Sequence, residues 1–192
     1  MARAALVLAA GMARRMSGPN KMLLSFHGKP LVRWAVEAAC GSSAERIVLV
    51  TGRDGDAVAE AAGGCARLER IHNPAPENGL AGSLHLGLAA LEGAEAIAVL
   101  LGDMPLIDAA LIDLLFSRWR ADAYALMPTH EGAMGNPVIL GAEAARDCLT
   151  LRGDGGARKL IEARMSEVIF VEAGTPAIFA DVDSGEDLAR YS

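Results

Sequence analysis

The stretch Leu6-Val7-Leu8-Ala9-Ala10-Gly11, which continues through a cationic loop to Lys21, decides how this chain folds. Uninterrupted apolar residues over 4–10 predict a short strand buried on both faces. The strand breaks off at Gly11, and the loop behind it carries arginines and Lys21. The buried strand thus brings two features to one place: a glycine, whose backbone a ligand can approach closely, and several cationic side chains. This combination suits a phosphorylated ligand.

Outward from this strand, short apolar runs alternate with patterns of helical spacing. We predict further strands over 47–51, 68–72, 96–101, 123–127, 137–140, 167–171 and 178–182, and helices over 30–38, 56–62, 83–91, 108–120, 142–149, 156–164 and from 184 onward. This alternation implies right-handed crossovers in an α/β fold, a Rossmann-like three-layer α/β/α arrangement with a mainly parallel sheet. The glycine-rich stretch 132–155 breaks the alternation and predicts a flap or a small antiparallel edge.

Length, charge and hydropathy limit the class of protein. The chain has 192 residues, 52% of them hydrophobic, and a net charge of −6. This length favours one domain, and the negative charge argues against nucleic-acid binding, which needs a basic field. No apolar run approaches the ~20 residues that span a bilayer, so no membrane contact is expected.

The three cysteines are widely spaced and form no CxxC pair. Cys40, Cys65 and Cys148 therefore fit neither a disulfide framework nor a zinc site, and we expect a reduced, cytoplasmic protein. The histidines, His130 among them, show no metal-ligand spacing and are interpreted as structural. The first loop carries neither the GxGxxG dinucleotide fingerprint nor the P-loop GxxxxGK[ST], which removes the usual support for a dehydrogenase or a P-loop ATPase.

Two aspartates stand where predicted strands end. Asp103 follows the apolar strand 96–101, and Asp183 follows the strand predicted over 178–182. Ligands of open α/β sheets bind outside the carboxyl ends of the strands, and carboxylates there hold Mg²⁺ against phosphate oxygens. Asp103 and Asp183 are thus predicted to share a metal ion, although each alone also fits a turn or helix-cap aspartate.

Three glycine-rich segments add candidate contacts. Gly79-Leu80-Ala81-Gly82-Ser83 opens a helix whose amino end favours an anion or a ribose-base edge, or else is a plain loop–helix junction. Gly135-Asn136-Pro137-Val138 and the segment 153–158 either line a second substrate pocket or are ordinary turns. In the first case Arg158 meets an anionic acceptor, and in the second it is a surface arginine.

Together these motifs resemble the MobA-like nucleotidyltransferases, and most of all the molybdenum cofactor cytidylyltransferases. The resemblance rests on the segments 8–21, 28–31, 73–84, 101–105, 135–138, 153–158 and 181–188. It departs from the family pattern at Ala13 and Ser17 in the first loop, and at Ser184 and Gly185 near the end. The guanylyltransferase branch usually has glycine where this chain has Ala10, so the resemblance favours CTP over GTP.

The resemblance implies the nucleotide-diphospho-sugar transferase-like fold in a single domain over 1–192. Its nucleotide-binding half covers about 1–105 and its acceptor-binding half about 106–192. The implied activity is Mg²⁺-dependent transfer of CMP from CTP to a molybdopterin-type molybdenum cofactor, with release of pyrophosphate. A guanylyltransferase, a sugar-phosphate nucleotidyltransferase of the same fold and a non-catalytic nucleotide-binding module remain alternatives. A molybdoenzyme or its chaperone is the implied protein partner.

The site residues follow from the motifs and the resemblance together. The predicted catalytic residues are Arg15, Lys21 and Asp103, and the predicted metal ligands are Asp103 and Asp183. The predicted nucleotide-binding residues are Leu8, Ala9, Ala10, Gly11, Lys21, Gly79, Leu80, Ser83, Gly102 and Asp103. The predicted acceptor-binding residues are Asn136, Pro137, Asp154 and Arg158.

Overall fold

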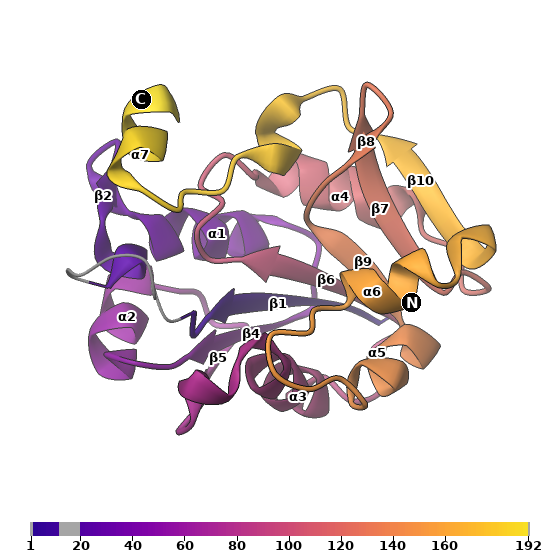
Figure 1. Ribbon diagram of the computed structural model, residues 1–192, viewed down its shortest axis with the longest axis horizontal. Coiled ribbons are helices and arrows are strands. Elements are labelled where there is room, and N and C mark those ends of the chain that lie inside the picture. Colours follow the sequence, from indigo (N-terminus) through magenta and orange to yellow (C-terminus); the bar gives the residue numbers. More distant parts are fainter. Residues whose placement is uncertain (1, 12–19, 192) are drawn as a thin grey trace.

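One β-sheet organises the computed structural model, which describes residues 2–11 and 20–191 (Figure 1). Within these residues an eight-stranded sheet runs in the order β10-β7-β9-β6-β1-β4-β5, with β8 paired to β7. The strands are β1 (Arg3–Ala9), β4 (Arg46–Thr51), β5 (Leu68–His72), β6 (Ala96–Leu101), β7 (Ala125–His130), β8 (Ala133–Met134), β9 (Val138–Gly141) and β10 (Val168–Glu172). A separate antiparallel pair joins β2 (Ser25–Phe26) and β3 (Lys29–Pro30).

Helices cover both faces of the sheet and confirm the predicted three layers. One face packs against α1 (Leu31–Gly41), α2 (Gly55–Ala62) and α4 (Ala109–Arg118), and the other against α3 (Leu80–Ala90), α5 (Ala142–Cys148) and α6 (Arg158–Glu162). Short 3₁₀ turns are η1 (Lys21–Leu23), η2 (Pro76–Asn78), η3 (Met165–Glu167) and η4 (Pro176–Phe179). The last helix, α7 (Gly185–Tyr191), lies beyond the end of the sheet (Figure 1).

Strand β1 is the buried centre of the sheet, as its sequence predicted. Successive side chains of a strand point to opposite faces, so Val7 packs with the α1 side and Leu6 with the α3 side. Burial of a side chain of this size stabilises the fold by roughly 1.5–3 kcal/mol. Helix α3 approaches β1 closely at Gly87, where an added Cβ would lie 2.2 Å from Cδ1 of Leu6.

Strand β9 corrects the expectation for the stretch 132–155. The strand β9 of this region is antiparallel, as expected, but it is not an edge strand. It lies inside the sheet between β6 and β7 and runs antiparallel to both. All four residues of β9 are buried, which suits a strand covered on both faces. Since β9 opposes both neighbours, β7 points the same way as β6, and the carboxyl ends of β1, β6, β7 and β10 meet at one edge.

The strand predicted over 178–182 is wrong. The chain forms η4 instead, with Pro176 in its first turn and the Thr175 hydroxyl accepting from the N–H of Ala177 at 3.2 Å. Proline suits the first position of a helical turn, and η4 takes up Ile178 and Phe179, the first two residues of the predicted strand. Past η4 the chain runs irregularly across the carboxyl ends of the central strands toward α7 (Figure 1).

The ends of two helices confirm predicted caps. The Asp108 carboxylate accepts from the N–H of Leu111 at 2.8 Å at the start of α4. Before α7, the Ser184 hydroxyl accepts from the N–H of Asp187 at 3.3 Å, and the Asp187 carboxylate accepts from the N–H of Asp183 at 3.0 Å. With Asp in the place of Glu, this arrangement resembles the capping box that the sequence predicts, except that the carboxylate accepts from Asp183, one residue before the Ser184 cap.

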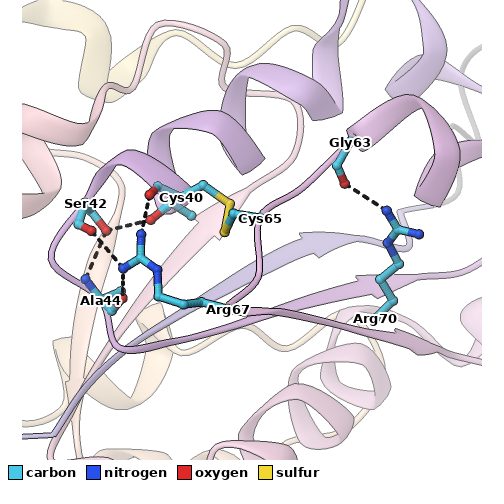
Figure 2. The surroundings of a disulfide bond; sticks show 8 residues. Cys40, Ser42, Ala44, Gly63, Cys65, Arg67 and Arg70 are labelled. Carbon is cyan, nitrogen blue, oxygen red and sulfur yellow. Dashed lines mark hydrogen bonds between the residues drawn. A yellow bond between two sulfur atoms is a disulfide. The ribbon is translucent and has the colours of Figure 1, made fainter.

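A disulfide between Cys40 and Cys65 contradicts the prediction that the cysteines stay unpaired (Figure 2). It joins the end of α1 to the segment after α2, and Cys148 remains a buried free thiol. The guanidinium of Arg67 donates to the carbonyls of Cys40, Ser42 and Ala44 and closes the same corner (Figure 2). A separation of 25 residues carries no pairing signal, because only the packing of α1 on α2 brings the two sulfurs together.

Within the described ranges, the helices are all too short or too polar to cross a lipid bilayer.

Candidate active site

A pocket of about 310 Å³ opens at the carboxyl ends of β1 and β6. It lies where ligands of open α/β sheets are expected. The pocket is lined by Leu8, Ala10, Gly11, Lys21, Met22, Pro76, Gly79, Leu80, Ser83, Leu101, Asp103 and Asp154. Most of the predicted nucleotide-binding residues therefore share one cavity, although they come from separate parts of the chain.

The end of β1 forms the floor of this pocket. Leu8 and Ala10 line it, whereas Ala9 faces the other side of the sheet and packs in the α1 core. Gly102 does not line the pocket but lies beneath it, donating from its N–H to the Leu8 carbonyl at 2.9 Å. An added Cβ at Gly102 would meet the Met22 sulfur at 2.9 Å, so glycine lets β6 end close against β1 and η1.

Lys21 joins the two predicted metal ligands. Its ammonium nitrogen lies 2.6 Å from Oδ2 of Asp103 and 2.7 Å from Oδ1 of Asp183. Lys21 and Asp103 are largely buried, with 12% and 15% of their side chains exposed, while Asp183 is half exposed. The structure thus brings together three predicted residues that are up to 162 positions apart in the sequence.

Backbone contacts hold both sides of this cluster in place. At the start of η1, the Asn20 side chain accepts from the N–H of Met22 at 3.1 Å and so fixes the turn that carries Lys21. On the other side, the N–H of Val182 donates to the carbonyl of Asp103 at 3.0 Å. Val182 is also fully buried against Phe26 and its neighbours, which anchors the segment leading to Asp183.

The charges of the cluster support one another. Partial burial lowers the pKa of Lys21, but the attraction of Asp103 and hydrogen bonds to both carboxylates outweigh it and leave the pKa above its usual value. Burial, together with the negative charges of Asp183 and Asp103, raises the pKa of nearby Asp181. The pocket edge therefore concentrates negative charge and favours a cation.

The residues present fit a divalent cation. Oδ1 of Asp103 is buried without a hydrogen-bond partner among the described residues, so one carboxylate oxygen is still available. In residues 2–11 and 20–191, no three acidic, histidine or cysteine side chains gather closely enough to cage a metal alone. Mg²⁺ is commonly held by one or two carboxylates plus substrate phosphates and water, which matches the pair Asp103 and Asp183.

The start of α3 forms the opposite wall. The Asn73 side chain donates to the Ser83 hydroxyl at 2.9 Å, and both residues are buried. The N–H of Ala81 donates to the Gly153 carbonyl at 3.0 Å, and an added Cβ at Gly79 would lie 2.3 Å from the carbonyl carbon of Gly153. The loop 153–156 is thus packed directly on the helix start.

The predicted acceptor-binding residues separate into different places. Asp154 lines the main pocket beside Gly79. Arg158 is exposed, pairs with Glu162 at 3.0 Å, and lines an adjoining cavity of about 440 Å³ that shares Asp154. Asn136 and Pro137 line neither cavity; they are joined by a cis peptide bond and lie beside η4.

Some predicted residues lie outside the described part of the chain, and some lining residues were not predicted. Arg15 lies outside it, together with Ala13 and Ser17. Met22, Pro76 and Leu101 line the pocket but were absent from the predicted set. Only their position in the sequence could have predicted them as lining residues. Each lies close to a predicted site segment, but none carries a charge or a hydroxyl group.

This fold and site define a nucleotide-binding enzyme that transfers phosphorus-containing groups. The sheet edge presents carboxylates, a lysine and a glycine-led helix start around one pocket. Such a set can hold a metal–phosphate complex and neutralise the charge that develops on phosphate oxygens. The chain belongs to the MobA-like NTP transferase domain family, whose model matches residues 5–168, and it is a nucleotidyltransferase of that family.

Sequence relatives agree with this family. The chain is 27% identical over 184 residues to a molybdenum cofactor cytidylyltransferase of Escherichia coli K12, covering 95% of this chain and 91% of that one. It is 30% identical over 190 residues to a molybdenum cofactor guanylyltransferase of Cereibacter sphaeroides, covering 96% and 93%. It is also 34% identical over 148 residues to the bifunctional protein GlmU of Pelobacter propionicus, with 74% of this chain matched, but spans only 32% of that protein.

Solved structures share the fold. A nucleotidyl transferase from Methanothermobacter thermautotroptrophicus superposes with a TM-score of 0.84 at 23% identity, covering 98% of this chain and 95% of that one. Rv0371c of Mycobacterium tuberculosis, in a complex with manganese, gives a TM-score of 0.79 at 21% identity, covering 99% and 97%. Nucleotidyltransferases of this family are typically dependent on a divalent metal.

Proposed function

We propose that this protein transfers CMP from CTP to a molybdopterin-type acceptor and releases pyrophosphate. The observation that carries the proposal is the convergence of Lys21, Asp103 and Asp183 at one pocket edge. The choice of acceptor is supported by two relatives named for the molybdenum cofactor, each matched over more than nine tenths of both chains. The choice of CTP is supported by Ala10, which lines the pocket at the position where the sequence resembles cytidylyltransferases.

In the proposed reaction, a phosphate oxygen of the acceptor attacks the α-phosphorus of CTP in line. The bond from the α-phosphorus to the bridging oxygen breaks, and pyrophosphate leaves with the electron pair. The attacking phosphate is already an anion, so no strong general base is required. Positioning and charge neutralisation supply the catalysis.

The chain's own residues have distinct roles in this proposal. Asp103 and Asp183 would hold Mg²⁺, which would neutralise phosphate charge. Lys21 and Arg15 neutralise charge on the β- and γ-phosphates as the bond breaks. The Lys21 ammonium lies between the two carboxylates, so it occupies the place that a divalent ion would take. The start of α3, with Gly79 and Ser83, contacts the nucleoside.

Purified protein tests the proposal. With Mg²⁺ and a molybdopterin acceptor, each of CTP, GTP, ATP and UTP is supplied in turn, and both pyrophosphate and the dinucleotide product are measured. We expect CTP to give the highest kcat/KM. Preferred use of GTP overturns the cytidylyl assignment, and the guanylyltransferase relative makes GTP the main alternative. Sugar 1-phosphates as acceptors test the second alternative, a sugar-phosphate nucleotidyltransferase of the same fold.

A further inference from the structure

A polar cluster lies at the carboxyl ends of β7 and β10, away from the pocket described above. Thr129 of β7 and Glu172 of β10 are register partners in the sheet, and His130 follows Thr129. The Glu172 carboxylate accepts from the Thr129 hydroxyl at 3.3 Å and from the N–H of Gly174 at 3.3 Å. Its Oε1 lies 3.2 Å from Nδ1 of His130. These contacts hold the carboxylate in one place.

Glu172 in turn orients the His130 ring. Although desolvation opposes ionisation, the hydrogen bonds from Gly174, His130 and Thr129 lower the pKa of Glu172. An ionised carboxylate only accepts, so Nδ1 of His130 carries the proton in this contact. The other ring nitrogen, Nε2, has no hydrogen-bond partner among the described residues, and 24% of the side chain is exposed. The ring thus presents one unsatisfied polar atom in a fixed orientation.

An exposed aromatic ring lies beside this histidine. Phe179 of η4 is 38% exposed, and its ring centroid is 6.4 Å from that of His130 with a 48° angle between the planes. The turn that carries Phe179 is held against the β7–β9 connection, because the N–H of Asn136 donates to the Ile178 carbonyl at 3.0 Å. An added Cβ at Gly135 would lie 2.5 Å from that carbonyl oxygen, so glycine permits the contact.

His130 and Phe179 lie on the same side of the sheet as Asp103 and Asp183, at the carboxyl ends of the strands. Only β9 separates β7 from β6, and where β9 pairs with both, at about 4.8 Å per strand, these two strands lie about 10 Å apart. Phe179 precedes Asp183 by four residues, which reach at most about 14 Å when extended. A phosphate at Asp103 and Asp183 can therefore belong to a ligand whose other end reaches His130 and Phe179.

We propose that His130 and Phe179 form the outer end of the acceptor site and bind a flat, nitrogen-containing ring joined to the reacting phosphate. Phe179 stacks on the ring, and Nε2 of His130 accepts a hydrogen bond from a ring N–H or amino group. Glu172 is a positioning residue, because it touches His130 and not the ligand. This inference deepens the proposed function and rests on it for the class of acceptor.

Fluorescence titration of neopterin monophosphate into the full chain tests this assignment. The probe carries a pterin ring and a phosphate but needs no turnover. We expect Phe179→Ala and His130→Ala each to raise its Kd at least about fivefold, with Phe179→Tyr and His130→Gln restoring part of the affinity. Glu172→Gln should weaken binding less than His130→Ala does. In all variants the Kd for CTP with Mg²⁺ should stay within about twofold of wild type.

Phe170→Ala is the matched control, because Phe170 is a similarly exposed phenylalanine of β10 that lies further from the sheet edge. It should bind the probe like wild type, and thermal unfolding shows whether each variant is folded. Unchanged affinity in the His130 and Phe179 variants, or no probe binding by the wild-type protein, overturns the inference. Failure of the proposed function is measured by a different experiment: the pyrophosphate assay would then show no release or a preference for GTP.

Discussion

The backbone N–H of Val182 donates a 3.0 Å hydrogen bond to the carbonyl of Asp103. This contact and the burial of Val182 fix the segment 181–183 beside the end of β6, so two carboxylates from distant parts of the sequence face the same lysine. Neither Asp103 nor Asp183 alone would hold a divalent ion well. The site therefore depends on how the C-terminal segment crosses the sheet edge.

Removal of the Lys21 ammonium or of the Asp103 carboxylate should slow catalysis. We expect Lys21→Ala and Asp103→Ala each to reduce turnover at least about tenfold, which corresponds to about 1.4 kcal/mol of barrier. Because the pKa of Lys21 is raised, its charge persists over about pH 6 to 9, and the loss in Lys21→Ala should be equal across that range. Steady-state pyrophosphate release measures both effects.

Lys29→Ala is the control for these variants, because Lys29 pairs with Glu37 on the surface, away from the pocket. It should retain wild-type turnover. Near-native rates in Lys21→Ala or Asp103→Ala would contradict the proposed mechanism.

Substitutions of Lys21 and of Asp103 should change the affinity for a divalent metal in opposite directions. The Lys21 ammonium pairs with Asp103 and Asp183, so a divalent ion that binds these carboxylates as proposed should compete with it. We expect Lys21→Met to tighten Mn²⁺ binding by about tenfold, or about 1.4 kcal/mol, and Asp103→Asn to weaken it by at least as much. Isothermal titration of Mn²⁺ measures both, with Lys29→Met as control. Weaker binding in Lys21→Met would show that the ammonium does not occupy the metal's place.

The wall formed by Gly79 should tolerate no side chain. Gly79→Ala places a Cβ 2.3 Å from the backbone of Gly153 in a conformation with φ of +95°, so we expect CTP affinity to fall at least about tenfold. Gly93→Ala separates the effect of the steric clash from that of the backbone conformation, because Gly93 has a similar φ of +86° but open space around it. That control should lose only about 1 kcal/mol of stability and bind CTP normally. Equal CTP affinity in both variants would disprove a role for this wall.

Base preference should depend on one methyl group. Ala10 lines the pocket, and its removal in Ala10→Gly enlarges the space for the nucleotide base. We expect the ratio of kcat/KM for GTP over CTP to rise about fourfold, the equivalent of about 0.8 kcal/mol for one methyl group. Ala9→Gly carries the same backbone cost but faces the other side of the sheet, so its ratio should not change. A ratio unaffected by Ala10→Gly would remove Ala10 from the argument for CTP.

The disulfide should stabilise the fold without touching the site. Closure of a loop with a separation of 25 residues contributes about 3.5 kcal/mol to the free energy of unfolding. We expect urea unfolding of the oxidised protein to show this difference against the reduced protein, and the Cys40→Ser variant to show no response to reductant. Cys148→Ala should keep the response, since Cys148 is the free thiol among the described cysteines. An identical midpoint for oxidised and reduced wild type would count against the bond.

The sequence by itself determined the layers and most of the candidate site. Apolar runs such as 4–10 predict buried strands because continuous hydrophobicity is stable only when both faces are covered, and glycines and charges at their ends predict where a ligand binds. These are local signals, so the sequence alone predicts Lys21, Asp103 and Gly79 as site residues. The capping box at Ser184 and Asp187 is local for the same reason.

Only the tertiary structure decided what depends on distant partners. The position of β9 inside the sheet, the pairing of Cys40 with Cys65 and the packing of Gly153 on Gly79 join segments whose separation in sequence carries no pairing signal. The turn η4 replaced a predicted strand because proline and a threonine cap outweigh apolar periodicity over a few residues. His130 shows the same limit: its sequence context predicted a structural histidine, whereas the register of β7 with β10 sets it against Glu172.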